Sequence, residues 1–154
     1  MKAVVQRVSR ASVSVGGKLV AGIGPGTLVL VAAAIADTEL EVEWLAAKIA
    51  GLRIFADASG KMNLDVAAIN GQILVVSQFT LYGDCRKGKR PSYSLAAPAE
   101  VAEKLYLNFI SRLRATGIPV SHGVFGAMMD VELVNDGPVT LILETPQSDR
   151  SDWG

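Results

Sequence analysis

Residues 70–81 read NGQILVVSQFTL and combine a turn signal with an apolar strand. Asn70-Gly71 is a typical hairpin dipeptide, because a tight two-residue turn needs positive φ at both central positions. The apolar segment that follows, residues 72–81, predicts a strand that ends in the polar string Ser77-Gln78-Phe79-Thr80. We therefore expect strands joined by hairpins, with a polar cluster at the end of one of them.

Four further strands are predicted upstream, at residues 2–8, 12–15, 18–23 and 27–34. Gly16-Gly17 supplies the tight turn between the second and the third of these strands. The fourth is an almost continuous apolar run, which is typical of a buried strand. The chain is thus expected to begin with a hairpin followed by a core strand.

Two helices are predicted from their end signals. Thr38 and Glu41 fit a capping box, and the apolar residues that follow recur on one helix face. Pro98 is expected to begin a second amphipathic helix, which Gly117 closes. Both helices have an apolar face that must pack against the sheet.

The last third of the chain predicts three more strands, at residues 120–124, 129–134 and 139–143. Asn135-Asp136-Gly137-Pro138 separates the last two and fits a hairpin turn. Strands connected mostly by hairpins, together with two helices, indicate an α+β fold. We expect an antiparallel sheet curled into a partial β-barrel with two packed helices.

The composition bounds the class of protein. The chain has 154 residues, of which half are hydrophobic and 19% charged, and its 15 basic and 15 acidic side chains cancel. One domain, residues 1–154, is expected at this length. A mean hydropathy of +0.34 is high for a small protein, so we expect some apolar surface to contact a partner chain. The zero net charge permits one local basic patch but not a protein coated in positive charge.

Several classes of chemistry are poorly supported. Cys85 and His122 are the only residues of their kind, which excludes an internal disulfide and a Cys/His metal cluster, and we expect no metal and no cofactor. The single cysteine favours the reducing cytoplasm. The uncharged segment 19–36 is interrupted by three glycines and Pro25, so no membrane span is predicted. Phosphate-loop, dinucleotide and zinc-protease strings do not occur, and a hydrolytic triad would depend on His122 alone.

Three segments could carry function, and each has an ordinary structural alternative. Polar side chains and N–H groups of residues 77–81 could form an oxyanion site, although Ser and Thr also favour ordinary strand ends. The cations Arg86, Lys87, Lys89 and Arg90 suit a phosphate backbone or a solvated charged loop about equally, and Tyr82 and Tyr93 beside them could stack on bases. Gly137-Pro138 fits a hairpin turn best, but a glycine and an X-Pro bond, which can be cis, could also present bare carbonyls to a ligand.

The sequence resembles the D-aminoacyl-tRNA deacylases of the bacterial type. The resemblance extends over the whole chain and is carried by MKAVVQRVSRASV (residues 1–13), SQFTLYGD (77–84), KGKRPSY (87–93) and GVFGAMMDVELVNDGPVT (123–140). It implies hydrolysis of the ester that joins a D-amino acid, or glycine mischarged on tRNA-Ala, to the terminal adenosine of tRNA. It also implies a homodimer with the active site at the interface, and the tRNA acceptor end as the partner, without DNA or a membrane.

The resemblance also assigns roles to individual residues. Ser77, Gln78, Phe79 and Thr80 are implied to be the catalytic residues that line the substrate pocket. Gly137-Pro138, in the cis form, is implied to reach the pocket from the other subunit. There two main-chain carbonyls would grip the α-amino group, and an L side chain would collide with them. Arg7 is implied to support this motif, and Phe125 and Met129 to line the pocket.

The sequence leaves the chemical mechanism open. Thr80 could be a nucleophile or could only shape the pocket, because the sequence places no evident base beside it. Our hypothesis is that the ribose 2′-hydroxyl of the substrate and N–H groups around Phe79 and Thr80 activate water and stabilise the oxyanion. A non-catalytic RNA-binding module and an esterase for small esters remain as alternatives.

Overall fold

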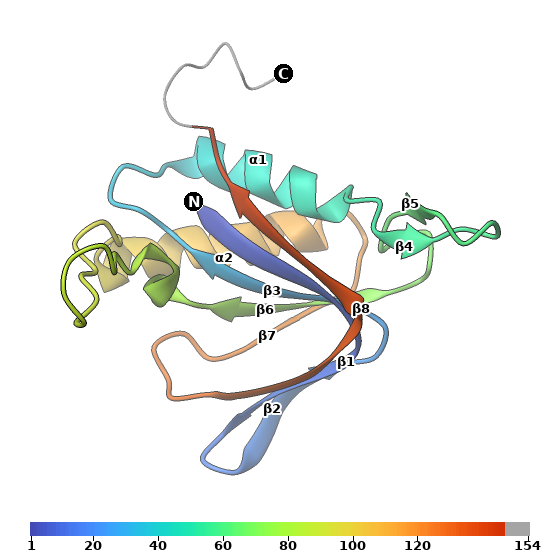
Figure 1. Ribbon diagram of the computed structural model, residues 1–154, viewed down its shortest axis with the longest axis horizontal. Helices are drawn as coiled ribbons and strands as arrows, with labels where there is room; N and C mark the ends of the chain where they lie inside the picture. The colour runs from blue at the N-terminus through green and yellow to red at the C-terminus, as the bar shows by residue number, and fades with distance from the viewer. Residues whose placement is uncertain (147–154) are drawn as a thin grey trace.

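The computed structural model describes residues 1–146, and residues 147–154 of the predicted domain lie outside this range. Its elements, in chain order, are β1 (Lys2–Val15), β2 (Lys18–Ile23), β3 (Gly26–Ala32), α1 (Glu39–Ala50), β4 (Phe55–Ala56), β5 (Met62–Leu64), β6 (Gln72–Ser77), the 3-10 helix η1 (Phe79–Tyr82), α2 (Ala99–Arg114), β7 (Val120–His122) and β8 (Asp130–Glu144). The two long helices pack on the same face of a strongly curled sheet (Figure 1). The predicted α+β class is therefore confirmed.

The sheet is mixed, which corrects the expected antiparallel sheet. Its strands follow the order β2-β1-β3-β6-β7, and β8 also pairs with β1. The pairs of β1 with β2, β3 and β8 are antiparallel, whereas β6 runs parallel to β3 and to β7. The physical reason is that α1 lies in the connection from β3 to β6 and α2 in that from β6 to β7, and helical crossovers join parallel strands.

The hairpin predicted at Asn70-Gly71 is wrong. Asn70 does have a positive φ of 52°, but the turn closes locally, through hydrogen bonds from Asn70 N to Ala67 O and from Gly71 N to Val66 O. The strand that follows then enters the sheet beside β3, with Gln72 opposite Gly26. This strand also ends earlier than predicted, at Ser77, where η1 begins after one residue.

Both ends of the chain contribute one long strand where the sequence predicted two. β1 runs unbroken through residues 2–15, and β8 runs through residues 130–144. Asn135-Asp136-Gly137-Pro138 is therefore not a hairpin turn. Thr140 pairs with Gln6 and Asn135 with Val8, so the residues between them bulge out of the ladder.

The core has two parts, one on each face of the curled sheet. The larger part lies between the sheet and the two helices, and the smaller part fills the inside of the curl, where Leu28, Leu74 and Val76 contact Val8 and Val13. The glycine pair at Gly16-Gly17 has the predicted positive φ, and Val15 pairs with Lys18 across it.

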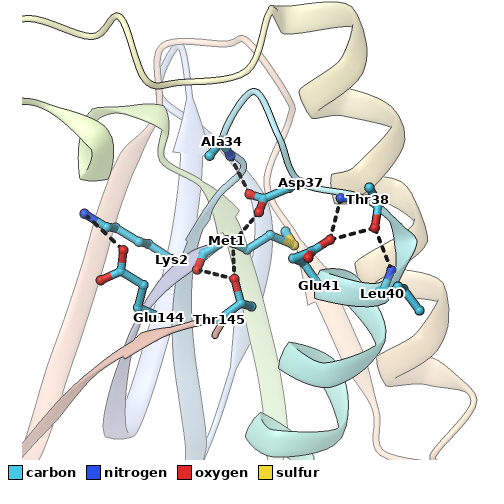
Figure 2. Close-up of polar contacts among 9 residues, drawn as sticks. All are labelled: Met1, Lys2, Ala34, Asp37, Thr38, Leu40, Glu41, Glu144 and Thr145. Carbon is cyan, nitrogen blue, oxygen red and sulfur yellow. Dashed lines mark hydrogen bonds and ion pairs between the residues drawn. The ribbon is translucent and has the colours of Figure 1, made fainter. Parts of the chain in front are cut away.

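The predicted helix starts are also confirmed, whereas α2 ends at Arg114 with Ala115 as its C-cap, before the predicted Gly117. The Thr38 hydroxyl accepts from Leu40 N, and the Glu41 carboxylate accepts from Thr38 N, which completes a capping box (Figure 2). A cap of this kind is worth about 1 kcal/mol. Pro98 is the N-cap of α2. Among residues 1–146, no helix is long and apolar enough to cross a membrane.

Candidate functional site

A cavity of about 350 Å³ lies where the parallel strands β3 and β6 end, against the first turns of α2. Its lining consists of Met1, Val31, Ala32, Ala33, Ser77, Phe79, Ala97, Ala99, Ala102, Tyr106, Phe125 and Gly126. Ligands commonly bind beyond the carboxyl ends of parallel strands, because the loops that follow can shape a pocket there. The volume falls in the range of small-molecule sites.

Two residues of the predicted string, Ser77 and Phe79, line this cavity, whereas Gln78 and Thr80 are not among its lining residues. Ser77 is the last residue of β6, and Gln78 N donates to Val31 O at 2.8 Å, which ties the string to β3. The chain then turns into η1, so Phe79 lines the cavity with 56% of its surface exposed. The first N–H groups of a helix have no partner within it, and here they belong to Phe79 and Thr80.

Thr80 is exposed beside the cavity. Its hydroxyl accepts a hydrogen bond from the side-chain amide of Gln78. An amide nitrogen cannot remove a proton from a hydroxyl group, so this contact orients Thr80 without activating it as a nucleophile. The geometry fits a residue that shapes the site.

The structure separates two residues that the sequence placed together as pocket lining. Phe125 lines the cavity, with its ring 5.6 Å from that of Tyr106. Met129 instead packs in the smaller core part, against Val13 and next to Gly123. The loop that carries both residues thus points Phe125 into the site and Met129 into the curl.

Tyr106 is a site residue that the sequence reasoning missed. It lies on the buried face of α2, lines the cavity and donates a hydrogen bond to Val75 O at 3.3 Å. Burial raises the pKa of Tyr106 to about 12, so its hydroxyl stays protonated at neutral pH. The alanines at 97, 99 and 102 also line the cavity, and this run of small residues in the sequence was the available signal, because small side chains leave space.

Gly137-Pro138 lies on the exposed bulge of β8, and its peptide bond is cis. Arg7 holds this bulge in place: its Nε donates to Asp136 O at 2.9 Å and its Nη1 to Ile54 O at 2.7 Å. From the other side, the Asn135 side chain accepts from Val139 N at 2.8 Å. The exposed backbone of Gly137 and Pro138 is therefore fixed by the hydrogen bonds of the residues around it.

The bulge and the cavity lie far apart within one chain. In the strand register, Ser77 lies opposite Val31, and Val31 lies opposite Ala3, whereas the bulge lies opposite Arg7. Four residues of strand correspond to roughly 13 Å, and β1 and β3 lie between β8 and β6. Figure 1 shows η1 and the bend in β8 at opposite ends of the sheet. A single protomer does not bring the two predicted parts of the site together.

The basic loop between η1 and α2 is only partly free. Arg86 forms a two-point ion pair with Asp84, at 2.9 and 2.6 Å, and the Arg86 guanidinium holds the pKa of Asp84 at about 2. Asp84 also pairs with Ser92 through two backbone hydrogen bonds, which close the loop. Within residues 1–146, the exposed Lys87, Lys89 and Arg90 have no carboxylate partner.

The two tyrosines that flank this loop differ in their surroundings. Tyr93 is 40% exposed, and its ring meets that of Phe79 edge to face at 5.2 Å, beside the cavity. Tyr82 is buried, with Lys2 Nζ 4.8 Å from its ring. Burial, together with the nearby carboxylates of Asp37 and Glu144, raises the pKa of Tyr82. Only Tyr93 is placed to stack on a base.

In the described part of the chain, no three His, Cys, Asp or Glu side chains are grouped where they could hold a metal ion. Cys85 is exposed in the basic loop, and His122 Nδ1 lies 2.7 Å from Gly123 O. The expectation that the site needs no metal or cofactor stays a prediction.

Comparisons with known proteins identify relatives over nearly the whole chain. The model of the family described as D-Tyr-tRNA(Tyr) deacylase matches residues 4–144. A D-aminoacyl-tRNA deacylase of Desulfatibacillum aliphaticivorans is 61% identical over 145 residues, which cover 94% of this chain and 99% of that protein. A D-aminoacyl-tRNA deacylase of Geobacter sulfurreducens is 55% identical over 151 residues, covering 98% of this chain and 99% of that protein.

Two solved structures have the same fold. One, described as c-Myc DNA Unwinding Element Binding Protein, is 48% identical, with a TM-score of 0.90 over 95% of this chain and 99% of that one. The other, described as a probable eukaryotic D-amino acid tRNA deacylase, has a TM-score of 0.80 over 92% of this chain and 97% of that one. At 17% identity, the second likeness shows the fold alone.

Proposed function

The chain belongs to the D-Tyr-tRNA(Tyr) deacylase family and is a D-aminoacyl-tRNA deacylase, and from this premise we propose how its surfaces divide the work. The cavity at the ends of β3 and β6 receives the terminal adenosine with its amino acid, and the basic loop holds the RNA backbone. The Gly137-Pro138 bulge of a second subunit reads the handedness of the amino acid. The same site accepts glycine mischarged on tRNA-Ala, and the reaction takes place in the cytoplasm.

The observation that carries this proposal is that Tyr93, in the basic loop, contacts Phe79, which lines the apolar cavity. Ser77 and Phe79 line the cavity, and Tyr93, which follows the cations of the basic loop in the chain, contacts Phe79. A single-stranded RNA end is recognised by stacking on aromatic rings and by cations along its phosphates. Lys87, Lys89 and Arg90 supply these cations, whereas the charge of Arg86 is already balanced by Asp84.

Handedness is read by backbone, because a glycine and a proline offer carbonyl groups without polar side chains. Two carbonyls can accept from the α-amino group of the substrate and so fix its orientation. An L side chain would then point at the carbonyls, while hydrogen or a D side chain points away. Because rejection depends on the Cα substituent alone, one site serves many D-amino acids.

The second subunit is proposed because the bulge cannot reach the cavity of its own chain. An apolar strip supports such an interface: Ile142, which is 81% exposed, pairs with Val4, and Val4 pairs with Leu30 on its other side. An ion pair between Lys2 and Glu144 lies beside this strip. In a twofold dimer the same strip covers itself, and each bulge is donated to the other subunit.

The chemical step is proposed to be assisted by the substrate. Gln78 orients Thr80, and Tyr106 keeps its proton, so neither supplies a base at neutral pH. The attacking water would pass its proton through the ribose 2′-hydroxyl of the substrate to the ribose oxygen that leaves as the ester bond breaks, and the N–H groups of Phe79 and Thr80 would stabilise the oxyanion. An oxyanion formed at the ester carbonyl needs donors that are already in place, which the turn into η1 provides.

A direct test compares D-Tyr-tRNA, L-Tyr-tRNA and the free ethyl ester of D-tyrosine as substrates. The proposal predicts rapid release of D-tyrosine from tRNA, and slow or absent reaction of the other two. Binding of tRNA without turnover would leave a non-catalytic RNA-binding module. Equal rates for the ester and the charged tRNA would indicate an esterase for small esters.

A further inference from the structure

The half-buried His122 lies at the base of the loop of residues 123–129, which connects β7 to β8. It is outside the set of described residues that line the candidate site. Its Nδ1 lies 2.7 Å from Gly123 O. Because a carbonyl oxygen can only accept, Nδ1 carries the proton of this hydrogen bond. The side chain therefore acts on the loop and does not touch the cavity.

The first residue of this loop is held from three directions. Gly123 N donates to Val75 O at 3.0 Å, while Gly123 O accepts from His122. A Cβ on Gly123 would lie 2.6 Å from Met129 Sδ, so the two ends of the loop are in contact. The base of the loop is thus fixed, and from this base the chain directs Phe125 into the cavity.

The ring of Tyr106 lies against both His122 and Phe125. It meets the imidazole edge to face, with centroids 6.4 Å apart, and the ring of Phe125 at 5.6 Å. Its hydroxyl donates to Val75 O, the same carbonyl that accepts from Gly123 N. Tyr106 is itself buried on α2. The helix therefore supplies a fixed surface, and the base of the loop determines where Phe125 lies against it.

We propose that His122 is a positioning residue, which holds Gly123 so that Phe125 forms a wall of the cavity, an inference that rests on the proposed function of the cavity. Without the Nδ1 donor, the Gly123 carbonyl loses its partner, and the loop no longer holds Phe125 in one place. The substrate then loses an apolar wall and binds less tightly. The groups proposed to react lie on β6 and η1 and stay where they are.

Two variants of nearly the same shape isolate the hydrogen bond. His122→Asn keeps an N–H donor one bond beyond Cγ, where Nδ1 is, whereas His122→Leu has the same branched shape and no donor. Steady-state kinetics with D-Tyr-tRNA are measured at a temperature where circular dichroism shows both to be fully folded. We expect KM of His122→Leu to be about five-fold above that of His122→Asn, equivalent to about 1 kcal/mol. The kcat values should agree within about two-fold.

A double-mutant cycle with Phe125→Ala tests whether the effect passes through the loop. Phe125→Ala alone should raise KM, and adding His122→Leu to it should raise KM no further. Thr116→Val is the matched control, because it also removes a side-chain hydrogen bond to a backbone carbonyl, that of Leu113 at 2.6 Å. It does so beyond the last turn of α2, whereas the cavity lies at the first turns, and KM should stay constant.

Equal KM values for His122→Leu and His122→Asn, or the same rise in KM with and without Phe125, would overturn the positioning role alone. A fall in kcat of His122→Leu with KM unchanged would also overturn it, since His122 would then act in the chemical step. If Phe125→Ala leaves KM unchanged, or if the unaltered chain fails to hydrolyse D-Tyr-tRNA, the proposed use of the cavity falls, and this inference falls with it.

Discussion

At the scale of single residues, the proposed selection of D-amino acids depends most on Gly137, whose φ of +140° is a conformation that L side chains rarely adopt. A Cβ there would also lie 2.9 Å from Val139 N and 3.1 Å from Arg7 Nη2. The backbone contact with Val139 N cannot be relieved without moving the bulge, whereas the end of the flexible Arg7 side chain needs to shift by only a few tenths of an ångström. The carbonyl groups proposed to hold the substrate would move with the bulge.

We therefore expect Gly137→Ala to lower kcat/KM for D-Tyr-tRNA by about 10²-fold, the usual cost of a misplaced positioning group. Gly60→Ala is the matched control, because Gly60 also has a positive φ but has open space around it. Single-turnover rates of both variants check this expectation. Normal cleavage of D-substrate and refusal of L-substrate by Gly137→Ala would contradict the steric explanation.

Thr80 separates the two chemical mechanisms. Because its hydroxyl is oriented by an amide and not by a base, Thr80→Ala should slow the single-turnover rate by less than about ten-fold. A nucleophile would lose several orders of magnitude on the same change and would be partly rescued in Thr80→Ser. The latter pattern would restore Thr80 as the attacking group.

The sequence predicted site residues best where a string of neighbours forms one local structure. Ser77 and Phe79 line the cavity together because the strand ends beside β3 at that point. Phe125 and Met129 could not be told apart, since only the path of their loop decides which of them faces the cavity. Tyr106 was missed because a tyrosine on the buried face of a helix has the same pattern as a core residue.

At the scale of secondary-structure elements, signals between residues close in sequence were sufficient to predict the local structure. The pairing of strands that are far apart in sequence could not be predicted. The capping box at Thr38 and the glycine turn between β1 and β2 involve residues close in sequence, and both are confirmed. The direction of β6 depends on β3, which lies far before it in the chain. The continuity of β8 depends on its pairing with β1 at the other end. An Asn-Asp-Gly-Pro string has the same turn chemistry in a hairpin and in a bulge.

The basic loop gives the prediction that belongs to this scale. If Lys89 contacts one phosphate, Lys89→Ala should weaken tRNA binding and reduce the slope of log K against log salt by roughly 0.7 to 0.9. Lys61→Ala provides the control, since Lys61 is exposed in the β4–β5 hairpin, away from η1 (Figure 1). Titrations at several salt concentrations measure both. Equal slopes for the two variants would indicate that the loop is solvated and does not contact RNA.

At the scale of the whole molecule, the apolar composition predicted a partner chain, and the strip of Val4, Leu30 and Ile142 is a surface where one could bind. Ile142→Glu should disrupt the proposed dimer and abolish activity. It should leave the protomer folded, because surface changes usually alter stability by less than about 0.5 kcal/mol. Leu19→Glu, which changes an exposed apolar residue at the β2 hairpin, is expected neither to disrupt the dimer nor to abolish activity. Sedimentation velocity and circular dichroism distinguish these outcomes, and an active Ile142→Glu monomer would refute the shared site.

A mixed dimer tests directly whether each site combines the cavity of one subunit with the Gly137-Pro138 bulge of the other. Phe79→Ala and Gly137→Ala chains with different tags are co-expressed, and the heterodimer is isolated by both tags in turn. If the two subunits share each site, one site of the heterodimer carries both substitutions and the other site carries none. The heterodimer should then recover about half of the wild-type deacylation rate. If each chain builds its own site, every site carries one change, and the heterodimer would be no more active than the two parent variants.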